Sequence, residues 1–237
     1  MNRPSLRLFF FLTAFTWASV PLDTLVSPDG SRAGLWIPST KKKLPLVVWL
    51  HGGIGANNPA KGVAAAFNMT TNWADSGSFA LLGPSAWPAS PWWTKEAANR
   101  VADLVEQASR RPGIDASKIV LSGVSDGGSG ALWIASALRK RWGNRLRGVA
   151  IWSANPDVMF MQQVSWDPIP LKGLAVRWTA GGQDHLYPLE RIHYWWEQCK
   201  TDGIKLQTHE NPTADHDLKF HQADLALFPA WVRRAAK

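Results

Sequence analysis

The stretch KIVLSGVSDGGSGALWIA, residues 118–135, decides how the rest of the chain is interpreted. An apolar run that is typical of a buried strand is followed at once by glycines and one serine, and then by helical spacing. Ser125 lies between Gly123 and Gly127, in the pattern Gly-x-Ser-x-Gly. A strand, a sharp turn and a helix in this order expose a serine hydroxyl above a sheet, and glycines two positions to either side avoid a steric collision.

The same glycines could instead surround a phosphate group. A dinucleotide-binding loop has the spacing Gly-x-Gly-x-x-Gly, which would need a third glycine where Trp133 stands. A P-loop needs Gly-Lys-Ser/Thr, which this sequence lacks. We therefore interpret Ser125 as a nucleophile and expect no nucleotide site.

Strand and helix patterns alternate on both sides of this stretch. Further strand patterns cover residues 44–50, 79–84, 146–154, 174–182 and 204–210, and helical spacing covers residues 60–77, 95–110, 126–141, 189–203 and 221–235. This alternation predicts the α/β fold class, with a mostly parallel central sheet, helices on both faces and no large lid domain. In such sheets the functional residues gather beyond the carboxyl ends of the strands.

A serine hydroxyl needs a base to take its proton, and the base needs an acid to orient it. In this strand–turn–helix arrangement the chain order is serine, acid, histidine. Asp184 follows the strand pattern at 174–182, and His216 follows the one at 204–210. The predicted catalytic residues are therefore Ser125, Asp184 and His216, with Asp157 as an alternative acid. The remaining histidines near the later strands are interpreted as structural or surface residues: His185, His193, His209 and His221.

The same chemistry needs backbone N–H groups that stabilise the negative charge of a tetrahedral intermediate. The residue after the nucleophile, Asp126, is predicted to supply one. The loop HGGIG at residues 51–55 follows a strand and is predicted to supply the other from Gly53, with Ile54 as the alternative. The six histidines and the single cysteine, Cys199, show no HExxH and no Cys/His ladder, so no metal site is expected.

The fifteen tryptophans suggest a further role for aromatic rings. Four of them follow strands on the expected functional side of the sheet: Trp87, Trp92, Trp93 and Trp166. These are candidates for stacking on an aromatic acyl group, a sugar ring or a polyester. The alternative is that tryptophans fill the core of a chain that cannot form an internal disulfide. Core filling is the interpretation preferred for Trp49, Trp133, Trp152 and Trp178.

The N-terminus has the features of an export signal. Two arginines precede the uncharged run LFFFLTAFTW, and small residues follow, which predicts a signal peptide over 1–18 and one domain over 19–237. An uncleaved anchor and a buried helix are the alternatives. No later stretch is apolar enough to span a bilayer, so we expect a secreted or periplasmic protein without stable membrane insertion after cleavage.

The formal net charge is +8, and the clearest basic cluster is RKRWGNRLR at residues 139–147. We interpret this cluster as the charged end of a helix and its turn, rather than as a surface for an acidic polymer. No nucleic-acid motif accompanies it, so no nucleic-acid partner is expected. The sequence does not indicate an oligomeric state.

Several stretches together resemble the α/β-hydrolase superfamily: LPLVVWLHGG (44–53), residues 113–135, TAGGQDHLYP (179–188) and DHDL (215–218). Within it, they are similar to small esterases of the phospholipase/carboxylesterase group and to secreted polyhydroxybutyrate-depolymerase-like and feruloyl-esterase-like enzymes. The resemblance covers nearly all of residues 19–237. It implies an exported serine esterase that forms an acyl-enzyme on a small-molecule or polymeric ester, without a cofactor.

The chain departs from those relatives in lacking a disulfide framework and an appended binding module. The segment where a lid could lie, residues 155–172, is short, so long-chain lipase activity is not expected. A serine peptidase or a thioesterase would use the same three residues. From a different class, a non-catalytic, tryptophan-rich binding protein is the alternative.

Overall fold

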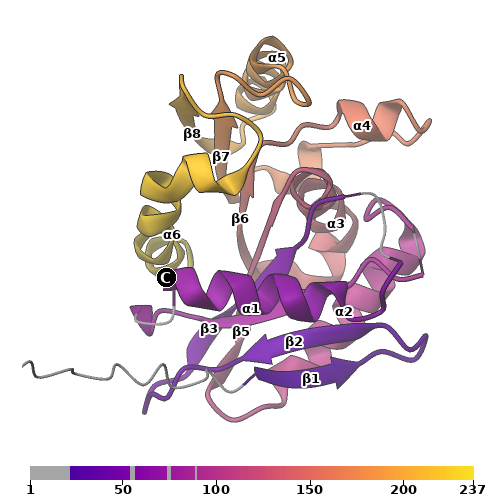
Figure 1. The fold of residues 1–237 in the computed structure, drawn as a ribbon, viewed down its shortest axis with the longest axis vertical. Helices are drawn as coiled ribbons and strands as arrows, with labels where there is room; N and C mark the ends of the chain where they lie inside the picture. The colour runs from indigo at the N-terminus through magenta and orange to yellow at the C-terminus, as the bar shows by residue number, and fades with distance from the viewer. Residues whose placement is uncertain (1–21, 54–56, 74–75, 89) are drawn as a thin grey trace, which may run out of the picture.

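The computed structural model describes residues 22–53, 57–73, 76–88 and 90–237, so the predicted signal peptide lies outside the described residues. The described part contains one eight-stranded sheet with the strand order β1-β2-β4-β3-β5-β6-β7-β8 (Figure 1). The strands are β1 (Leu22–Val26), β2 (Arg32–Trp36), β3 (Leu44–Leu50), β4 (Ala80–Pro84), β5 (Ile114–Val124), β6 (Leu146–Trp152), β7 (Ala175–Gly181) and β8 (Lys205–Asn211).

Every strand pairing from β4 across to β8 is parallel, which confirms the predicted sheet. At the other edge, β1 pairs antiparallel with β2, and β2 pairs antiparallel with β4. This edge hairpin has no counterpart in the sequence prediction. Its strands are only five residues long, and β1 buries one side chain fully, so neither shows a strong apolar alternation.

Helices cover both faces of the sheet, as predicted. The helices α1 (Lys61–Trp73) and α6 (Gln222–Ala235) pack on one face. On the other face lie α2 (Lys95–Ser109), α3 (Asp126–Trp142) and α5 (Leu189–Thr201). Between β6 and β7 the chain forms only the single turn α4 (Asp157–Phe160) and a 3₁₀ turn at Ile169–Leu171, and the described residues contain no large lid.

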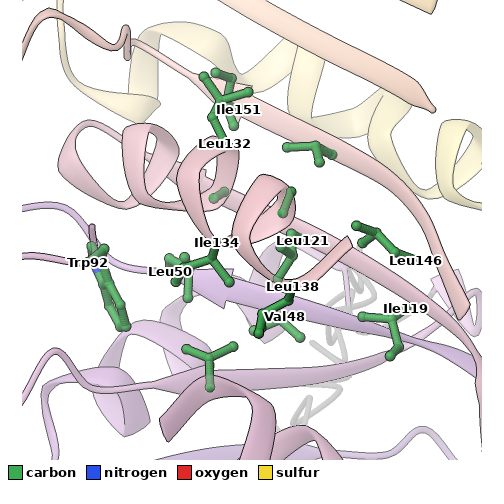
Figure 2. Close-up of a cluster of buried hydrophobic side chains, with 14 of the residues drawn as sticks. Val48, Leu50, Trp92, Ile119, Leu121, Leu132, Ile134, Leu138, Leu146 and Ile151 are labelled. Atoms are coloured by element: carbon green, nitrogen blue, oxygen red, sulfur yellow. The ribbon is translucent and has the colours of Figure 1, made fainter. Parts of the chain in front are cut away.

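The central strand β3 shows why the sequence folds in this way. Alternate side chains of a strand point to opposite faces. Val48 and Leu50 therefore enter the larger core beneath α2 and α3, while Val47 and Trp49 enter the smaller core beneath α1 and α6. Figure 2 shows part of the larger core, where side chains of α3 pack on β3 and β5.

Polar and charged residues define the ends of two helices. Thr94 caps α2, because its side chain accepts a hydrogen bond from the N–H of Ala97 at 3.1 Å. In the basic cluster, Arg139 donates to the carbonyl of Leu146, and Arg145 pairs with Glu106 at 2.7 Å. These contacts support the interpretation of the cluster as the charged end of a helix.

Two further features concern the single cysteine and the lengths of the helices. Cys199 is buried in α5, and burial raises the pKa of its thiol to about 12, so it is a core residue rather than a nucleophile. Among the described residues, every helix is too short or too polar to cross a bilayer.

Candidate active site

Ser125 stands at the junction of β5 and α3, at the carboxyl edge of the sheet. Its backbone has φ 56° and ψ −131°, a strained conformation for a residue with a side chain. The tight turn leaves no room on either side. A Cβ atom on Gly123 would lie 2.4 Å from the carbonyl oxygen of Gly127, and one on Gly127 would lie 2.1 Å from that of Leu50. The two glycines of the motif are therefore steric requirements of the exposed serine.

The acid and the base lie on two loops that contact each other through their backbones. The loop after β7 carries Asp184, and the loop after β8 carries His216. The N–H of Gly182 donates to the carbonyl of Asn211 at 2.8 Å. A Cβ atom on Gly181 would lie 2.5 Å from the carbonyl oxygen of Ala214, so only glycine permits this approach. The backbone contact between the loops fixes the distance between their functional side chains.

The three predicted side chains form one chain of hydrogen bonds. His216 Nε2 lies 3.0 Å from Ser125 Oγ, and His216 Nδ1 lies 2.9 Å from Asp184 Oδ2. The carboxylate places the imidazole proton on Nδ1, which leaves Nε2 free to accept the serine proton. The side chain of Asp184 is fully buried, whereas that of His216 is 24% exposed. The base is thus open to a substrate while its acid is protected from water.

The environment favours the charged form of both partners. The hydrogen bond that His216 donates to Asp184 raises the pKa of His216 against the opposing effect of burial, and the charges of Asp184, Asp126 and Asp215 add to the increase. Burial alone would raise the pKa of Asp184. Hydrogen bonds from His216 and from the N–H groups of Tyr187 and Leu186 outweigh burial and lower it. An imidazolium formed during a reaction would therefore be stabilised.

The loop after β3 passes close to the serine, where an oxyanion hole was predicted. A Cβ atom on Gly52 would lie 3.1 Å from that of Ser125, and Gly53, with φ 81°, lines the pocket beside the serine. Asp126 lines the same pocket and begins α3. The alternative donor, Ile54, lies outside the described residues.

His51 holds this loop in place. Its Nε2 accepts a hydrogen bond from the N–H of Ala86 at 3.1 Å, so Nδ1 carries the proton and donates to the carbonyl of Gly52 at 3.0 Å. Burial lowers the pKa of His51 to about 4, and the charge of Lys61 lowers it further. The histidine of the HGG motif is therefore a neutral structural anchor.

A pocket of about 570 Å³ opens beside the serine and the histidine. Four of its lining residues are apolar, and two of these are largely exposed: Val158, Pro188, Met161 (84%) and Leu186 (71%). Its polar lining comes from Asn155, Asp126, Asp157 and Tyr187. The pocket can thus hold an apolar group, and no lysine or arginine lines it among the described residues.

The structure does not bring the four candidate tryptophans to this pocket. Trp92 and Trp93 are fully buried, and Trp166 is 6% exposed. Trp92 lies in the core in Figure 2 and donates its indole N–H to the carbonyl of His51 at 3.0 Å. Trp87 is half-buried in the loop after β4 and is not among the pocket-lining residues. For Trp92, Trp93 and Trp166 the core interpretation replaces stacking on a substrate.

The reason for this correction is that α3 and the segment after α4 cover these rings. Trp93 donates to the side chain of Gln162, and Trp166 donates to the hydroxyl of Ser136 at 3.0 Å. A Cβ atom on Gly130 would lie 2.2 Å from that of Trp92, so α3 packs directly on this ring. Of the tryptophans that were assigned to the core, Trp133 is half-buried, and the others are buried: Trp49, Trp152 and Trp178.

The alternative acid and the remaining histidines lie elsewhere. Asp157 accepts two hydrogen bonds from Arg191, at 2.7 and 2.9 Å, and one from Trp195, so it is not part of the triad. Exposed histidines are found at 185, 193 and 209, whereas His221 is buried. Within the described ranges, no group of three histidine, cysteine or acidic residues is arranged to hold a metal ion.

Sequence reasoning missed one residue of the site. Tyr187 is 7% exposed and packs its ring on that of His216, with centroids 5.5 Å apart and an interplanar angle of 10°. Its hydroxyl donates to Asp126 Oδ1 at 2.8 Å. The only signal for it was its position three residues after Asp184 in the sequence DHLY.

No protein-family model matches the chain, and no curated protein matches it in sequence. Solved structures do match. Esterase 2 of Thermogutta terrifontis, phosphorylated by paraoxon, has a TM-score of 0.69 at 16% identity, over 90% of this chain and 94% of that one. An esterase of the archaeon Pyrobaculum calidifontis has a TM-score of 0.66 at 18% identity, over 92% and 86%. A ferulic acid esterase has a TM-score of 0.65 at 18% identity, over 92% and 98%.

These identities are too low to transfer a substrate, but the overlap extends over nine-tenths of the chain. The serine elbow after β5 and the acid and histidine loops after β7 and β8 lie where that architecture places its functional residues. The chain therefore has the α/β-hydrolase fold.

Proposed function

We propose that the protein is a serine hydrolase that cleaves carboxylic esters through an acyl-enzyme intermediate. The observation that carries this proposal is the hydrogen-bonded chain from Ser125 through His216 to Asp184, at 3.0 and 2.9 Å, at the edge of an open pocket. Esterases among the similar structures support the choice of substrate class.

In the first half of the reaction, Ser125 Oγ attacks the carbonyl carbon, and its proton passes to His216 Nε2. Asp184 accepts the Nδ1 hydrogen bond and stabilises the imidazolium. The negative charge on the carbonyl oxygen is stabilised by the N–H groups of Asp126 and Gly53. The carbon–oxygen bond to the alcohol then breaks, and His216 returns the proton to the leaving oxygen. Water repeats the sequence on the acyl-enzyme, releasing the acid and restoring Ser125.

The pocket favours a neutral, apolar group on the substrate. Its apolar wall would bury a short or aromatic acyl chain, and its charged lining residues include the carboxylate of Asp126, which accepts a hydrogen bond from the hydroxyl of Tyr187. A substrate with its own carboxylate would be repelled. One charge at about 6 Å in an effective dielectric of about 40 contributes about 1.4 kcal/mol, or about tenfold in rate.

The first experiment asks whether Ser125 is reactive. A fluorophosphonate probe should label the wild-type protein at Ser125 and leave S125A unlabelled. Ester hydrolysis should fall by about 10⁴-fold or more in S125A. An unlabelled wild-type protein would favour the non-catalytic binding protein, and the proposal would be wrong.

The second experiment defines the substrate. A panel of acetyl, butyryl, long-chain and feruloyl esters, with a polyester film, a thioester and a peptide, ranks the acyl groups. We expect neutral esters to exceed the thioester and the peptide in kcat/KM. Ethyl hexanoate should exceed monoethyl adipate by about tenfold, and D126N should reduce that ratio. Equal rates on the two esters would exclude a role for the carboxylate in selectivity.

We also propose that the protein is exported to the periplasm or the medium. The charged, apolar and small-residue order of residues 1–18 supports this proposal. Cell fractionation and N-terminal sequencing of the expressed full chain test it. A mature protein that begins at Ser19 outside the cytoplasm is the expected result, and an intact N-terminus in the cytoplasm contradicts it.

A further inference from the structure

Tyr187 contacts all three segments that make up the site. Its hydroxyl donates to Asp126 Oδ1 at 2.8 Å, and Asp126 directly follows the nucleophile. Its backbone N–H donates to Asp184 Oδ1 at 3.0 Å. Its ring lies nearly parallel to that of His216, at 5.5 Å and 10°. One residue therefore connects α3, the acid loop and the histidine loop through its side chain and its backbone N–H.

These connections matter because the segments are distant along the chain. Ser125 and His216 are 91 residues apart, and His216 is separated from Asp184 by 32. A displacement of about 1 Å in such a constellation is enough to reduce a rate by about a hundredfold. The phenol ring of the tyrosine covers one face of the imidazole. The tyrosine hydroxyl in turn connects the phenol ring to the start of α3. The imidazole is thereby restrained between its two hydrogen-bond partners.

The hydroxyl also has an electrostatic effect. The N–H of Asp126 is the proposed oxyanion donor, so the carboxylate of the same residue lies close to a site of developing negative charge. A hydrogen bond from the buried phenol reduces the effective negative charge of the Asp126 carboxylate and fixes its orientation. The groups that act on His216 are the carboxylates of Asp184, Asp126, Asp215 and Asp217 and the neutral ring of Tyr187.

We propose that Tyr187 is a positioning residue that acts through Asp126, holding the imidazole of His216 in line between the serine and its acid. This inference rests on the proposed hydrolase function. The variant Y187F keeps the stacked ring and the backbone N–H and removes only the hydroxyl. The chain has one other tyrosine, Tyr194, which is 47% exposed on α5, and Y194F is therefore the matched control.

The test measures kcat and KM on p-nitrophenyl butyrate for the wild type, Y187F, Y194F, D126A and the double variant Y187F/D126A. Active-site titration with the fluorophosphonate corrects each rate for the fraction of folded enzyme. We expect Y187F to lower kcat by about tenfold with KM within about twofold, because only the reacting geometry is disturbed. Y194F should match the wild type.

The double variant identifies the pathway. If the hydroxyl acts through Asp126, removing it from D126A should have no further effect, so the double variant should match D126A. D126N retains an acceptor for the hydroxyl and should lose less kcat than D126A. Its acid limb of kcat/KM should move to lower pH, because one negative charge near His216 is removed.

Two results would overturn the inference. In the first, Y187F behaves like Y194F. In the second, Y187F lowers kcat as much in the D126A background as in the wild type, which would show that the hydroxyl acts through another neighbour, Ser125 or Ser129, and not through Asp126. Failure of the proposed function itself looks different, because the wild-type protein would then show no hydrolysis that S125A abolishes.

Discussion

Among the described residues, two pairs of serine and histidine form similar hydrogen bonds, and only one of the two pairs is arranged for catalysis. Ser125 and Ser153 both have positive φ, at 56° and 45°, and both follow strands of the sheet. Ser125 Oγ lies 3.0 Å from His216 Nε2, and Ser153 Oγ lies 3.2 Å from His221 Nε2. The hydrogen bond between serine and histidine is therefore nearly the same in the two places.

The surroundings of the two pairs differ. His216 is 24% exposed beside the pocket and carries Asp184 on its other nitrogen, whereas His221 is 1% exposed. The acid nearest in sequence to His221, Asp224, instead bonds to Arg177, Thr179 and Trp152. The comparison teaches that a serine–histidine contact becomes a reactive site only with an orienting acid and an opening to substrate. The buried pair instead links the residue after β6 to the 3₁₀ turn Leu218–His221, which follows the histidine loop.

The largest expected effect separates the two serines. S125A should lower kcat/KM by about 10⁴-fold or more, and S153A should leave it within about threefold, because Ser153 has no surface through which a substrate could reach it. Peptide mapping after fluorophosphonate treatment should find the adduct on residue 125. An adduct on residue 153 would break the comparison.

The next effect separates the two acids. D184N should lower kcat by about 10⁴-fold, because the amide favours the wrong imidazole tautomer. D224N should leave kcat per titrated active site unchanged but lower the free energy of unfolding by about 3–5 kcal/mol, because it leaves the buried Arg177 without its ion pair. Urea denaturation and steady-state kinetics of the two variants measure both quantities. Similar profiles for the two variants would contradict the assignment.

A smaller effect concerns the pH dependence of the rate. His216 must be neutral to accept the serine proton, and its pKa is raised by Asp184 and, to a lesser degree, by Asp126 and Asp215. The acid limb of kcat/KM should therefore have its midpoint above about pH 6.5, the ordinary histidine value. D215N, on an exposed residue, should move the limb to lower pH. A limb that stays in place in D215N would exclude this charge as a cause.

The smallest effect concerns stability. Burial lowers the pKa of His221 in the folded protein, so below about pH 6.5 the unfolded chain binds a proton that the folded one does not. The free energy of unfolding should decrease as pH falls below that value, by at most about 1.4 kcal/mol per pH unit, and H221Q should flatten this slope. His216 has the opposite sign, because its raised pKa adds stability that is lost as pH rises through the folded value. H216Q should therefore remove the loss of stability above about pH 6.5 and leave the slope below that value unchanged, as urea midpoints between pH 5 and 8 would show.

Much of the sheet and the placement of the triad could be predicted from the sequence. Apolar runs such as LPLVVWL locate buried parallel strands, and residues that follow those strands must meet at one edge. That rule predicts that Ser125, Asp184 and His216 lie at the same edge of the sheet. The edge hairpin of β1 and β2 was not predicted, because its short strands are defined by their pairing with each other and with β4 rather than by their composition.

The loop that carries Trp92, and the residue Tyr187, show which contacts could not be predicted from the sequence. A position after a strand indicates a side of the sheet but not the direction of a side chain, and α3 covers Trp92 through a contact that only Gly130 permits. Tyr187 acts through partners 29 and 61 residues away, so its local sequence contains no period or motif that reveals them. Contacts of this kind are decided by tertiary packing.

The backbone contact between the acid and histidine loops has a consequence for how the protein tolerates variation. Gly181 and Gly182 carry no functional group, yet a methyl group on either would meet a carbonyl oxygen of the facing loop at 2.5 or 2.6 Å. In a saturation library sorted for turnover, these two positions should be as intolerant as the residues that react. Engineering of a new specificity would do better to diversify Met161 and Leu186, whose exposed side chains can change without moving any backbone.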